Sequence, residues 1–308
     1  MASPSPLCDL VAAELAEPVD PRVAAMAAAI AARYPGAARA VLFYGSCLRQ
    51  RELDGLMLDF YLIVSDYRAA YGRSWLAAAN RLIPPNVFPI EHDGLAAKYA
   101  VLSEADFRRE TGQFARSTSV WARFAQPSRL VWVSDAGTRD RVVEIVAGAA
   151  PTLFQHTLPM MEPHRVRPAD IWRRGFELTY TAELRAERSS RPGSIIEADP
   201  DRYERFGVAA LARIAQPTGV GPASEVAVIA SPAQARRWWR RMRVKGKALT
   251  LLRLAKASAT FAGGIDYLAW KINRHAGTRI EVKPWQRRWP LVAALILLPR
   301  LWRRKAIR

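Results

Sequence analysis

Short apolar runs alternate with helix-forming stretches through about the first 150 residues. Four of these runs have the length and composition of buried strands: residues 40–44, 56–64, 98–102 and 129–133. The clearest helix signal begins at the cap Asp20-Pro21 and ends at Pro35-Gly36. Further helices are expected over residues 74–82, after a cap at Ser103, and from about residue 138. Strands that alternate with helices predict the α/β class.

From residue 168 onward the pattern becomes helical. Residues 169–188 and 199–214 place apolar side chains at a helical period, and residues 233–256 form a long basic helix candidate. By contrast, Glu91, His92 and Asp93 follow Pro89 and are expected to form a turn. We therefore expect an α/β domain over residues 1–160, a helical domain over 161–230 and a basic C-terminal region over 231–308.

The net charge is confined to that last region. Residues 231–308 carry 20 lysines and arginines against two acidic residues, Asp266 and Glu281, which equals the whole formal net charge of +18. A neutral body with a basic C-terminal region predicts contact with an anionic partner. Nucleic acid and acidic phospholipid are the two candidates.

An apolar run near the C-terminus favours phospholipid. Residues 290–298 are too few to cross a bilayer as a helix, which takes about 20 residues. Tryptophans and arginines flank the run on both sides, which is typical of an interfacial anchor. We expect this anchor to use Trp285, Trp289, Leu295, Leu297, Leu298 and Trp302. The alternative is a core helix with a basic end.

A second aromatic pair lies further upstream. Trp238-Trp239 is flanked by arginines and has the same interfacial composition, although such a pair could equally stack on nucleic-acid bases.

The remaining composition favours a protein kept in the cytoplasm. Cys8 and Cys47 are too few for a disulfide scaffold, and neither the cysteines nor the four histidines have the spacing of a zinc site. The N-terminal residues do not resemble a signal peptide. With the expected anchor, these observations predict a peripheral protein on the cytoplasmic face of the cell membrane.

One motif indicates a candidate catalytic site. The strand that ends in Tyr44 is followed by Gly45-Ser46, and thirteen residues after the serine Asp59 interrupts an apolar strand. A strand that turns sharply at Gly-Ser exposes N–H groups and a hydroxyl that can hold a phosphate, and a neighbouring aspartate can place a divalent metal against it. Gly-Ser alone could be an ordinary turn. A lone carboxylate in a buried strand, however, is costly without a partner.

This motif resembles the Gly-Ser and strand-aspartate pattern of the DNA polymerase β nucleotidyltransferase superfamily, with Met57 in place of the first of two aspartates. The single aspartate is similar to that of the mitochondrial phosphatidate cytidylyltransferases, the translocator assembly and maintenance type of CDP-diacylglycerol synthase. Residues 97–102, 124–131 and 178–185 resemble further segments of that family, in the same order. Two departures are Cys47, where the family has glycine, and Glu183, where it has aspartate.

The resemblance implies a nucleotidyltransferase domain followed by a helical domain that could be winged-helix-like. It implies that Tyr44, Gly45 and Ser46 bind the CTP phosphates, with Arg185 nearby. Asp59 and Glu183 would bind Mg²⁺ or Mn²⁺, and Lys98 would neutralise phosphate charge, so that Asp59, Lys98 and Glu183 are the catalytic residues. Without the resemblance, Lys98 could be a surface lysine and Glu183 a solvated helix charge. Asp66 is a reserve metal ligand.

We therefore expect an enzyme that makes CDP-diacylglycerol and pyrophosphate from CTP and phosphatidic acid at an anionic membrane surface. Two alternatives stay open, a nucleotidyltransferase that acts on RNA or protein, and a non-catalytic membrane adaptor with the same fold. The leucine run argues against a nucleic-acid partner, because RNA binding does not need it. The oligomeric state and the acyl-chain preference are not predicted.

Overall fold

A mixed five-stranded sheet organises the described part of the N-terminal half. The computed structural model describes residues 5–49, 52–72, 75–162, 166–182, 191–215, 231–260 and 283. Along the sheet the strand order is β3-β4-β2-β1-β5. The strands are β1 (Ala38–Tyr44), β2 (Met57–Val64), β3 (Asn86–His92), β4 (Leu95–Ser103) and β5 (Ser128–Val133). The β2–β4 pair is parallel and the other pairs are antiparallel. The α/β class is thus confirmed, as are the four expected strands.

Strand β3 was not expected, and the turn predicted at Glu91, His92 and Asp93 is only partly correct. Glu91 and His92 still belong to β3, and the chain turns at Asp93 and Gly94, where φ is 47° and 73°. The edge position of β3 explains how it tolerates Pro89, because an edge strand does not need every backbone N–H for pairing.

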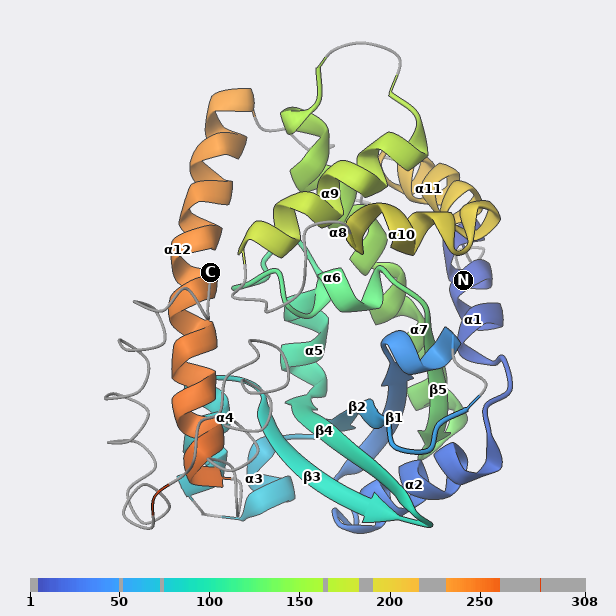
Figure 1. Cartoon of the computed structure of the whole chain (residues 1–308), viewed down its shortest axis with the longest axis vertical. Helices are drawn as coiled ribbons and strands as arrows, with labels where there is room; N and C mark the ends of the chain where they lie inside the picture. The colour runs from blue at the N-terminus through green and yellow to red at the C-terminus, as the bar shows by residue number, and fades with distance from the viewer. Residues whose placement is uncertain are drawn as a thin grey trace.

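The two faces of the sheet are covered by different helices (Figure 1). One face carries Val41, Phe60 and Leu62 and packs against α2 (Pro21–Ala32) and α3 (Tyr67–Tyr71). The opposite face is covered by α1 (Pro6–Leu15), α5 (Glu104–Thr111), α6 (Trp121–Phe124) and α7 (Ala136–Ala147). Helix α4 (Trp75–Leu82) lies against β3 and α3. As expected, Asp20 caps α2, because its carboxylate accepts a hydrogen bond from the N–H of Arg22 at 2.8 Å.

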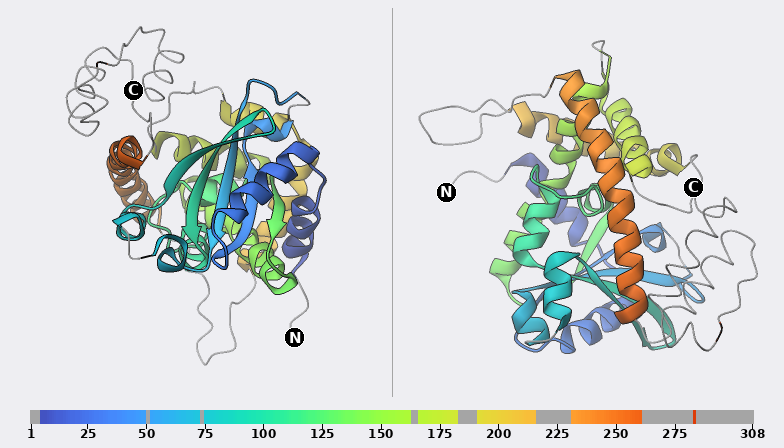
Figure 2. Two further views of the ribbon diagram at one scale, coloured as in Figure 1. Left: turned by 90° about the horizontal axis from the view of Figure 1, so that it is seen from below. Right: turned by 90° about the vertical axis from the view of Figure 1, so that its left-hand side faces the viewer.

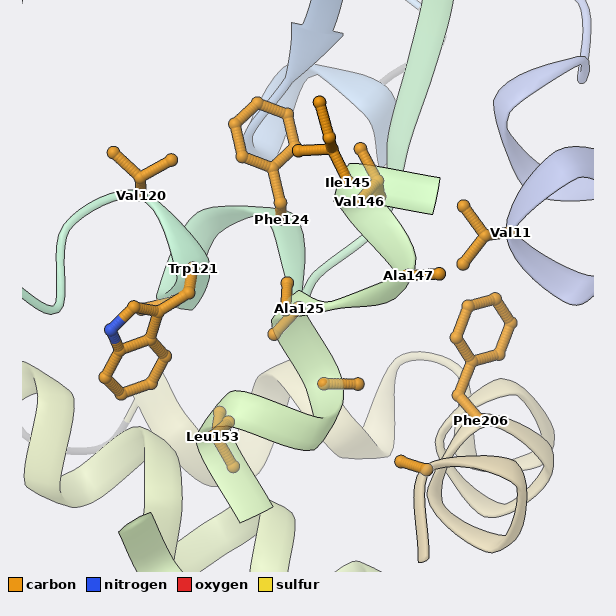
Figure 3. Close-up of a cluster of buried hydrophobic side chains, with 14 of the residues drawn as sticks. Val11, Val120, Trp121, Phe124, Ala125, Ile145, Val146, Ala147, Leu153 and Phe206 are labelled. Atoms are coloured by element: carbon orange, nitrogen blue, oxygen red, sulfur yellow. The ribbon is translucent and has the colours of Figure 1, made fainter. Parts of the chain in front are cut away.

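The helices that follow β5 and α7 contribute to the apolar core on the same face of the sheet as α1, α5, α6 and α7. They are α8 (Ala149–Thr157), α9 (Pro168–Ala182), α10 (Arg191–Glu197) and α11 (Pro200–Ala215). Figure 3 shows Trp121 and Phe124 of α6, Leu153 of α8, Val11 of α1 and Phe206 of α11 in one apolar cluster. The boundary expected near residue 160 stays a prediction, and side chains from both of its sides contribute to this core.

Helix α12 (Pro232–Thr260) runs along one side of the described part of the protein (Figures 1 and 2). Its first turns are held by aromatic contacts: the Trp239 side chain is 2% exposed and its Nε1–H donates to the His156 carbonyl at 2.9 Å. Trp238 stacks on the His156 ring, with centroids 3.7 Å apart. The interfacial or base-stacking role expected for this pair is therefore wrong for Trp239, whose ring is buried, and stays a prediction for the partly buried Trp238.

The middle of α12 crosses the end of α9 very closely. A Cβ atom on Gly246 would lie inside the contact distance of the Ala182 carbonyl oxygen, so only glycine fits at this crossing. The C-terminal half of α12 then packs against β3.

None of the described helices is long and apolar enough to cross a membrane. The expected anchor residues, Trp285, Trp289, Leu295, Leu297, Leu298 and Trp302, lie outside the described residues.

Candidate functional site

Three neighbouring strands bring the central predicted residues together. Asp59 of β2 is in register with Tyr44 of β1 and with Lys98 of β4. The Lys98 Nζ lies 2.9 Å from Asp59 Oδ1, and their side chains are 30% and 26% exposed. Lys98 of the neighbouring strand β4 is thus the partner that a lone carboxylate in a largely buried strand requires. The parallel register of β2 and β4 places the two side chains on the same face of the sheet.

Gly45 lies directly beside this ion pair. Its φ of +99° is a conformation that L-residues rarely adopt, and a Cβ atom there would lie 3.5 Å from Asp59 Oδ2. The chain then enters a short 3₁₀ turn, η1 (Ser46–Arg49), where Ser46 is exposed. The structure therefore brings the Gly-Ser turn and the strand aspartate to one end of the sheet.

Cys47, the next residue of this turn, is buried. Burial raises the pKa of the Cys47 thiol, and the nearby Asp59 carboxylate adds to the rise. A thiol with a raised pKa is a poor nucleophile at neutral pH. Cys47 is thus a packing residue, in spite of its position beside the site.

Tyr44 closes the inner side of the site. Its ring packs on the rings of Tyr61 and Phe124, with centroid distances of 5.1 and 6.2 Å. Burial raises the pKa of the Tyr44 phenol well above its usual value, with a further contribution from Asp59, while Arg123 acts in the opposite direction. Tyr44 is therefore a neutral hydroxyl rather than a phenolate.

A cavity of about 160 Å³ continues from Lys98 along the same face of the sheet. Helices α6 and α12 both contribute residues to its lining. Four of its lining residues are cationic, namely Lys98, Arg123, Arg253 and Lys256, and no acidic residue lines it among the described residues. Tyr44, Tyr61 and the buried Ser119 add hydroxyl groups to its lining. We call Tyr44, Lys98, Ser119, Arg123, Arg253 and Lys256 the cationic pocket.

Two residues of α12 are fixed at this pocket by hydrogen bonds. Arg253 donates to the Pro84 carbonyl and to Ser119 Oγ, both at 2.8 Å. Lys256 donates to the carbonyls of Ile83 and Pro85, the latter at 2.9 Å. Burial, with the neighbouring Arg253 charge, lowers the pKa of Lys256 to about 7. The sequence offered no signal for these two residues beyond the basic character of their helix.

The described residues supply one carboxylate at this site. No group of three His, Cys, Asp or Glu side chains that could hold a metal ion is found within them. The expected second ligand, Glu183, and the expected phosphate ligand, Arg185, lie outside the described residues. The reserve ligand Asp66 instead caps α3, accepting hydrogen bonds from the N–H groups of Arg68 and Ala69.

A larger cavity, of about 360 Å³, lies between α1 and α11. Four of its charged groups form ion pairs within the protein, Arg202 with Glu14 and Arg129 with Glu17. The other two, Asp199 and Arg205, hydrogen-bond to the backbone of α11. The Arg202 side chain is only 3% exposed, so its pair with Glu14 fixes α11 against α1. This cavity shows no arrangement of groups directed at a ligand.

No protein-family model matches the chain, and no curated protein matches it either.

Proposed function

We propose that this protein is a phosphatidate cytidylyltransferase of the translocator assembly and maintenance type, which makes CDP-diacylglycerol from CTP and phosphatidic acid. The observation that carries the proposal is the position of Asp59 on β2, beside the Gly45 turn that follows β1 and in an ion pair with Lys98 of β4. A Gly-Ser turn at the end of one strand, beside an aspartate on the next, is the arrangement that a nucleotidyltransferase domain requires.

Each residue then has a role set by its chemistry. The turn at Gly45 and Ser46 offers backbone N–H groups and a hydroxyl to the triphosphate, because glycine lets the backbone approach closely. Lys98 adds a positive charge at the same end of the sheet, and its Nζ is held 2.9 Å from Asp59 Oδ1. Such fixed charges stabilise the negative charge that accumulates during phosphoryl transfer.

The residues fit a hard divalent cation in one respect. The Asp59 carboxylate is a hard oxygen donor, and Mg²⁺ is often held by one or two carboxylates together with substrate phosphates. Asp59, with Glu183 as the proposed second carboxylate, would hold Mg²⁺ or Mn²⁺. When bound, such a metal polarises the phosphoryl oxygens.

The reaction forms one bond and breaks one. An oxygen of the phosphatidate phosphate bonds to the α-phosphorus of CTP. The bond from that phosphorus to the bridging oxygen then breaks, and pyrophosphate leaves with the electron pair. The protein aligns the two phosphates and stabilises charge, which is most of the catalysis in this type of reaction. The membrane-bound acceptor explains why the basic region of residues 231–308 would bind an anionic surface.

The test is CTP turnover on liposomes with and without phosphatidic acid, with detection of pyrophosphate and CDP-diacylglycerol. We expect transfer that depends on Mg²⁺ and on phosphatidic acid. Asp59→Asn should abolish it at nearly constant side-chain volume, whereas Asp54→Asn, a loop carboxylate paired with Arg22, should not. A folded Asp59→Asn protein with normal turnover would contradict the assignment.

Membrane attachment is tested separately by removing residues 285–308. The shortened protein should still bind CTP but sediment poorly with anionic liposomes, and it should recover activity on short-chain phosphatidate. Sedimentation equal to that of the full chain would place the anchor elsewhere.

One observation favours a second candidate, a nucleotidyltransferase that acts on RNA. The first half of α12 exposes a dense group of arginines: Arg236, Arg237, Arg240, Arg241 and Arg243. Such a group can also follow a phosphate backbone. Incorporation of labelled CTP into RNA, with no CDP-diacylglycerol formed, would decide for this candidate.

A further inference from the structure

A second groove lies between α9, the 3₁₀ turn η2 (Leu158–Met160) and the first half of α12. Figures 1 and 2 show α12 passing beside α9. Arg240 in this groove and Arg253 in the cationic pocket are 13 residues apart on α12, which is roughly 20 Å along the helix axis. We infer that this groove binds the headgroup of an acidic phospholipid, at a site separate from the active site. The choice of a membrane lipid as the partner rests on the proposed function.

The lining of this groove is strongly cationic. No acidic residue of the described chain lines it, whereas five arginines do: Arg174 of α9, with Arg236, Arg237, Arg240 and Arg243 of α12. We call it the arginine groove. Arg174 is paired with Glu177 at 3.2 Å. The four arginines of α12 are exposed, and they make no hydrogen bond or ion pair with another residue of the described chain. Their charges therefore complement an anionic partner.

The cost of these arginines to α12 indicates a function. The helix contains no Asp or Glu that could compensate them. Arg236, Arg240 and Arg243 follow one another at spacings of four and three residues, at which like charges destabilise a helix. Trp239 already fixes this part of α12 through its buried ring and its hydrogen bond to the His156 carbonyl. The arginines are not needed to hold the helix, and a bound phosphate group offsets their mutual repulsion.

The apolar part of the lining favours a lipid over a nucleic acid. Its residues are Met160, Leu178, Ala233 and Trp239. The Trp239 side chain is only 2% exposed, and no other aromatic residue of the described chain lines the groove, so bases find no ring to stack on. Val244 of α12 is 69% exposed among exposed cations, which is typical of a helix at a membrane interface. Arginines for the phosphate and apolar side chains for the glycerol match a phospholipid headgroup.

The size of the arginine groove agrees with such a ligand. Its volume of about 550 Å³ lies within the roughly 300–1,000 Å³ of small-molecule sites. Stable attachment to a bilayer generally takes two signals, such as an apolar anchor and a basic patch. The arginine groove is then the second signal, in addition to the anchor predicted at residues 285–308. It holds α12 at the bilayer, while the second half of the same helix lines the cationic pocket.

The test is titration calorimetry of the full-length protein with two short-chain lipids, dihexanoyl phosphatidylglycerol and dihexanoyl phosphatidylcholine. Neither is the proposed acceptor, so neither reports on the active site. Arg236→Gln combined with Arg240→Gln removes two charges from the groove. Lys245→Gln combined with Lys247→Gln is the matched control, because it removes two exposed charges of the same helix outside the groove.

We expect the groove variant to weaken phosphatidylglycerol binding by about 10-fold or more, and the control variant by less than about threefold. The zwitterionic phosphatidylcholine should bind weakly to all three proteins. All four substituted side chains are exposed, so both variants should keep the Tm of the unsubstituted protein. Equal hydrogen exchange of the α12 amides in the two variants would exclude a displaced helix as the cause.

Vesicles test the same groove at a bilayer. The three proteins are sedimented with phosphatidylcholine vesicles that contain or lack phosphatidylglycerol. The groove variant should sediment less than the control variant with the acidic vesicles, and the difference should shrink as salt is added. The predicted anchor is the same in all three proteins, so it does not contribute to the difference.

The outcomes separate this inference from the proposed function. Equal effects of the two double variants would indicate diffuse charge rather than a site and overturn the inference, as would an unsubstituted protein that does not bind phosphatidylglycerol. Loss of RNA-oligonucleotide binding in the groove variant, with lipid binding unchanged, would make the groove a nucleic-acid surface and also overturn it. Lipid binding that needs Arg236 and Arg240, in a protein without CTP turnover, would support the groove and refute the proposed function.

Discussion

Replacing Gly45 with alanine tests the reading of the Gly-Ser turn, and Gly36 offers a matched control. Both glycines have a positive φ, +99° at Gly45 and +72° at Gly36. An alanine in such a conformation costs roughly 1–2 kcal/mol of folding free energy, because its Cβ atom crowds the backbone. The two surroundings differ. A Cβ atom at Gly36 meets nothing within 4 Å, whereas at Gly45 it lies 3.5 Å from Asp59 Oδ2.

Both variants should therefore lose similar stability, and only one should lose activity. For a chain of this size, 1–2 kcal/mol corresponds to a Tm lowered by about 2–6 °C. Gly45→Ala should also reduce turnover by about 100-fold, the cost of displacing reacting groups by about 1 Å. The assays are thermal unfolding by circular dichroism and CTP turnover on phosphatidate liposomes, measured well below the Tm of both variants.

Two results would refute this reasoning. Equal turnover by Gly45→Ala and Gly36→Ala would mean that the turn does not approach the phosphates. Equal and severe losses of turnover in the two variants would mean that activity follows the stability of the fold, and that Gly45 has no special role.

Three more predictions follow from other parts of the molecule. Gly246→Ala should raise hydrogen exchange in α12, because the added methyl group pushes the helix away from α9. Gly193→Ala, which meets only a side-chain oxygen at 3.4 Å, should leave that exchange unchanged. Burial lowers the pKa of His156 to about 4. Between about pH 4 and 6.5, His156 is therefore protonated in the unfolded chain but neutral in the folded protein. Urea unfolding should therefore show stability falling by roughly 3 kcal/mol as the pH drops through this window, and His156→Phe should remove that part of the decline. Glu183→Gln should cost as much activity as Asp59→Asn and combine with it non-additively; a mild, additive loss would exclude Glu183 as a metal ligand.

Local signals in the sequence predicted most of the sheet. Asp20-Pro21 marks the start of α2, and the strand that ends at Tyr44 was expected within two residues of its observed bounds. These features depend on neighbouring residues only, such as a cap, a positive φ or an apolar run. Strand β3 was not predicted, because Pro89 and its polar neighbours resemble a turn. Only their pairing with β4 makes these residues a strand.

The site was predicted in part for the same reason. Asp59 and the Gly-Ser turn lie thirteen residues apart, and their pattern is visible in the chain. Arg123 and Arg253 are 130 residues apart, and nothing near either of them indicates a common pocket. Trp239 shows the converse error, because arginines on both sides of it suggested a surface, while the helix turns its ring into the core.

The hydrogen bonds from Lys256 to Ile83 and Pro85 also set an order of events during synthesis. All five strands have been synthesised once the chain extends beyond Val133, yet Lys256 is added more than 120 residues later. At translation rates of about 5–20 residues per second, roughly 6–25 s pass between the synthesis of β5 and that of Lys256. During this time α12 does not cover the sheet face. A nascent chain can thus present the strand aspartate and the Gly-Ser turn before the pocket is closed. Ribosome-bound chains stalled with residue 256 still inside the exit tunnel, or already emerged from it, would separate nucleotide binding from transfer without any substitution in the site.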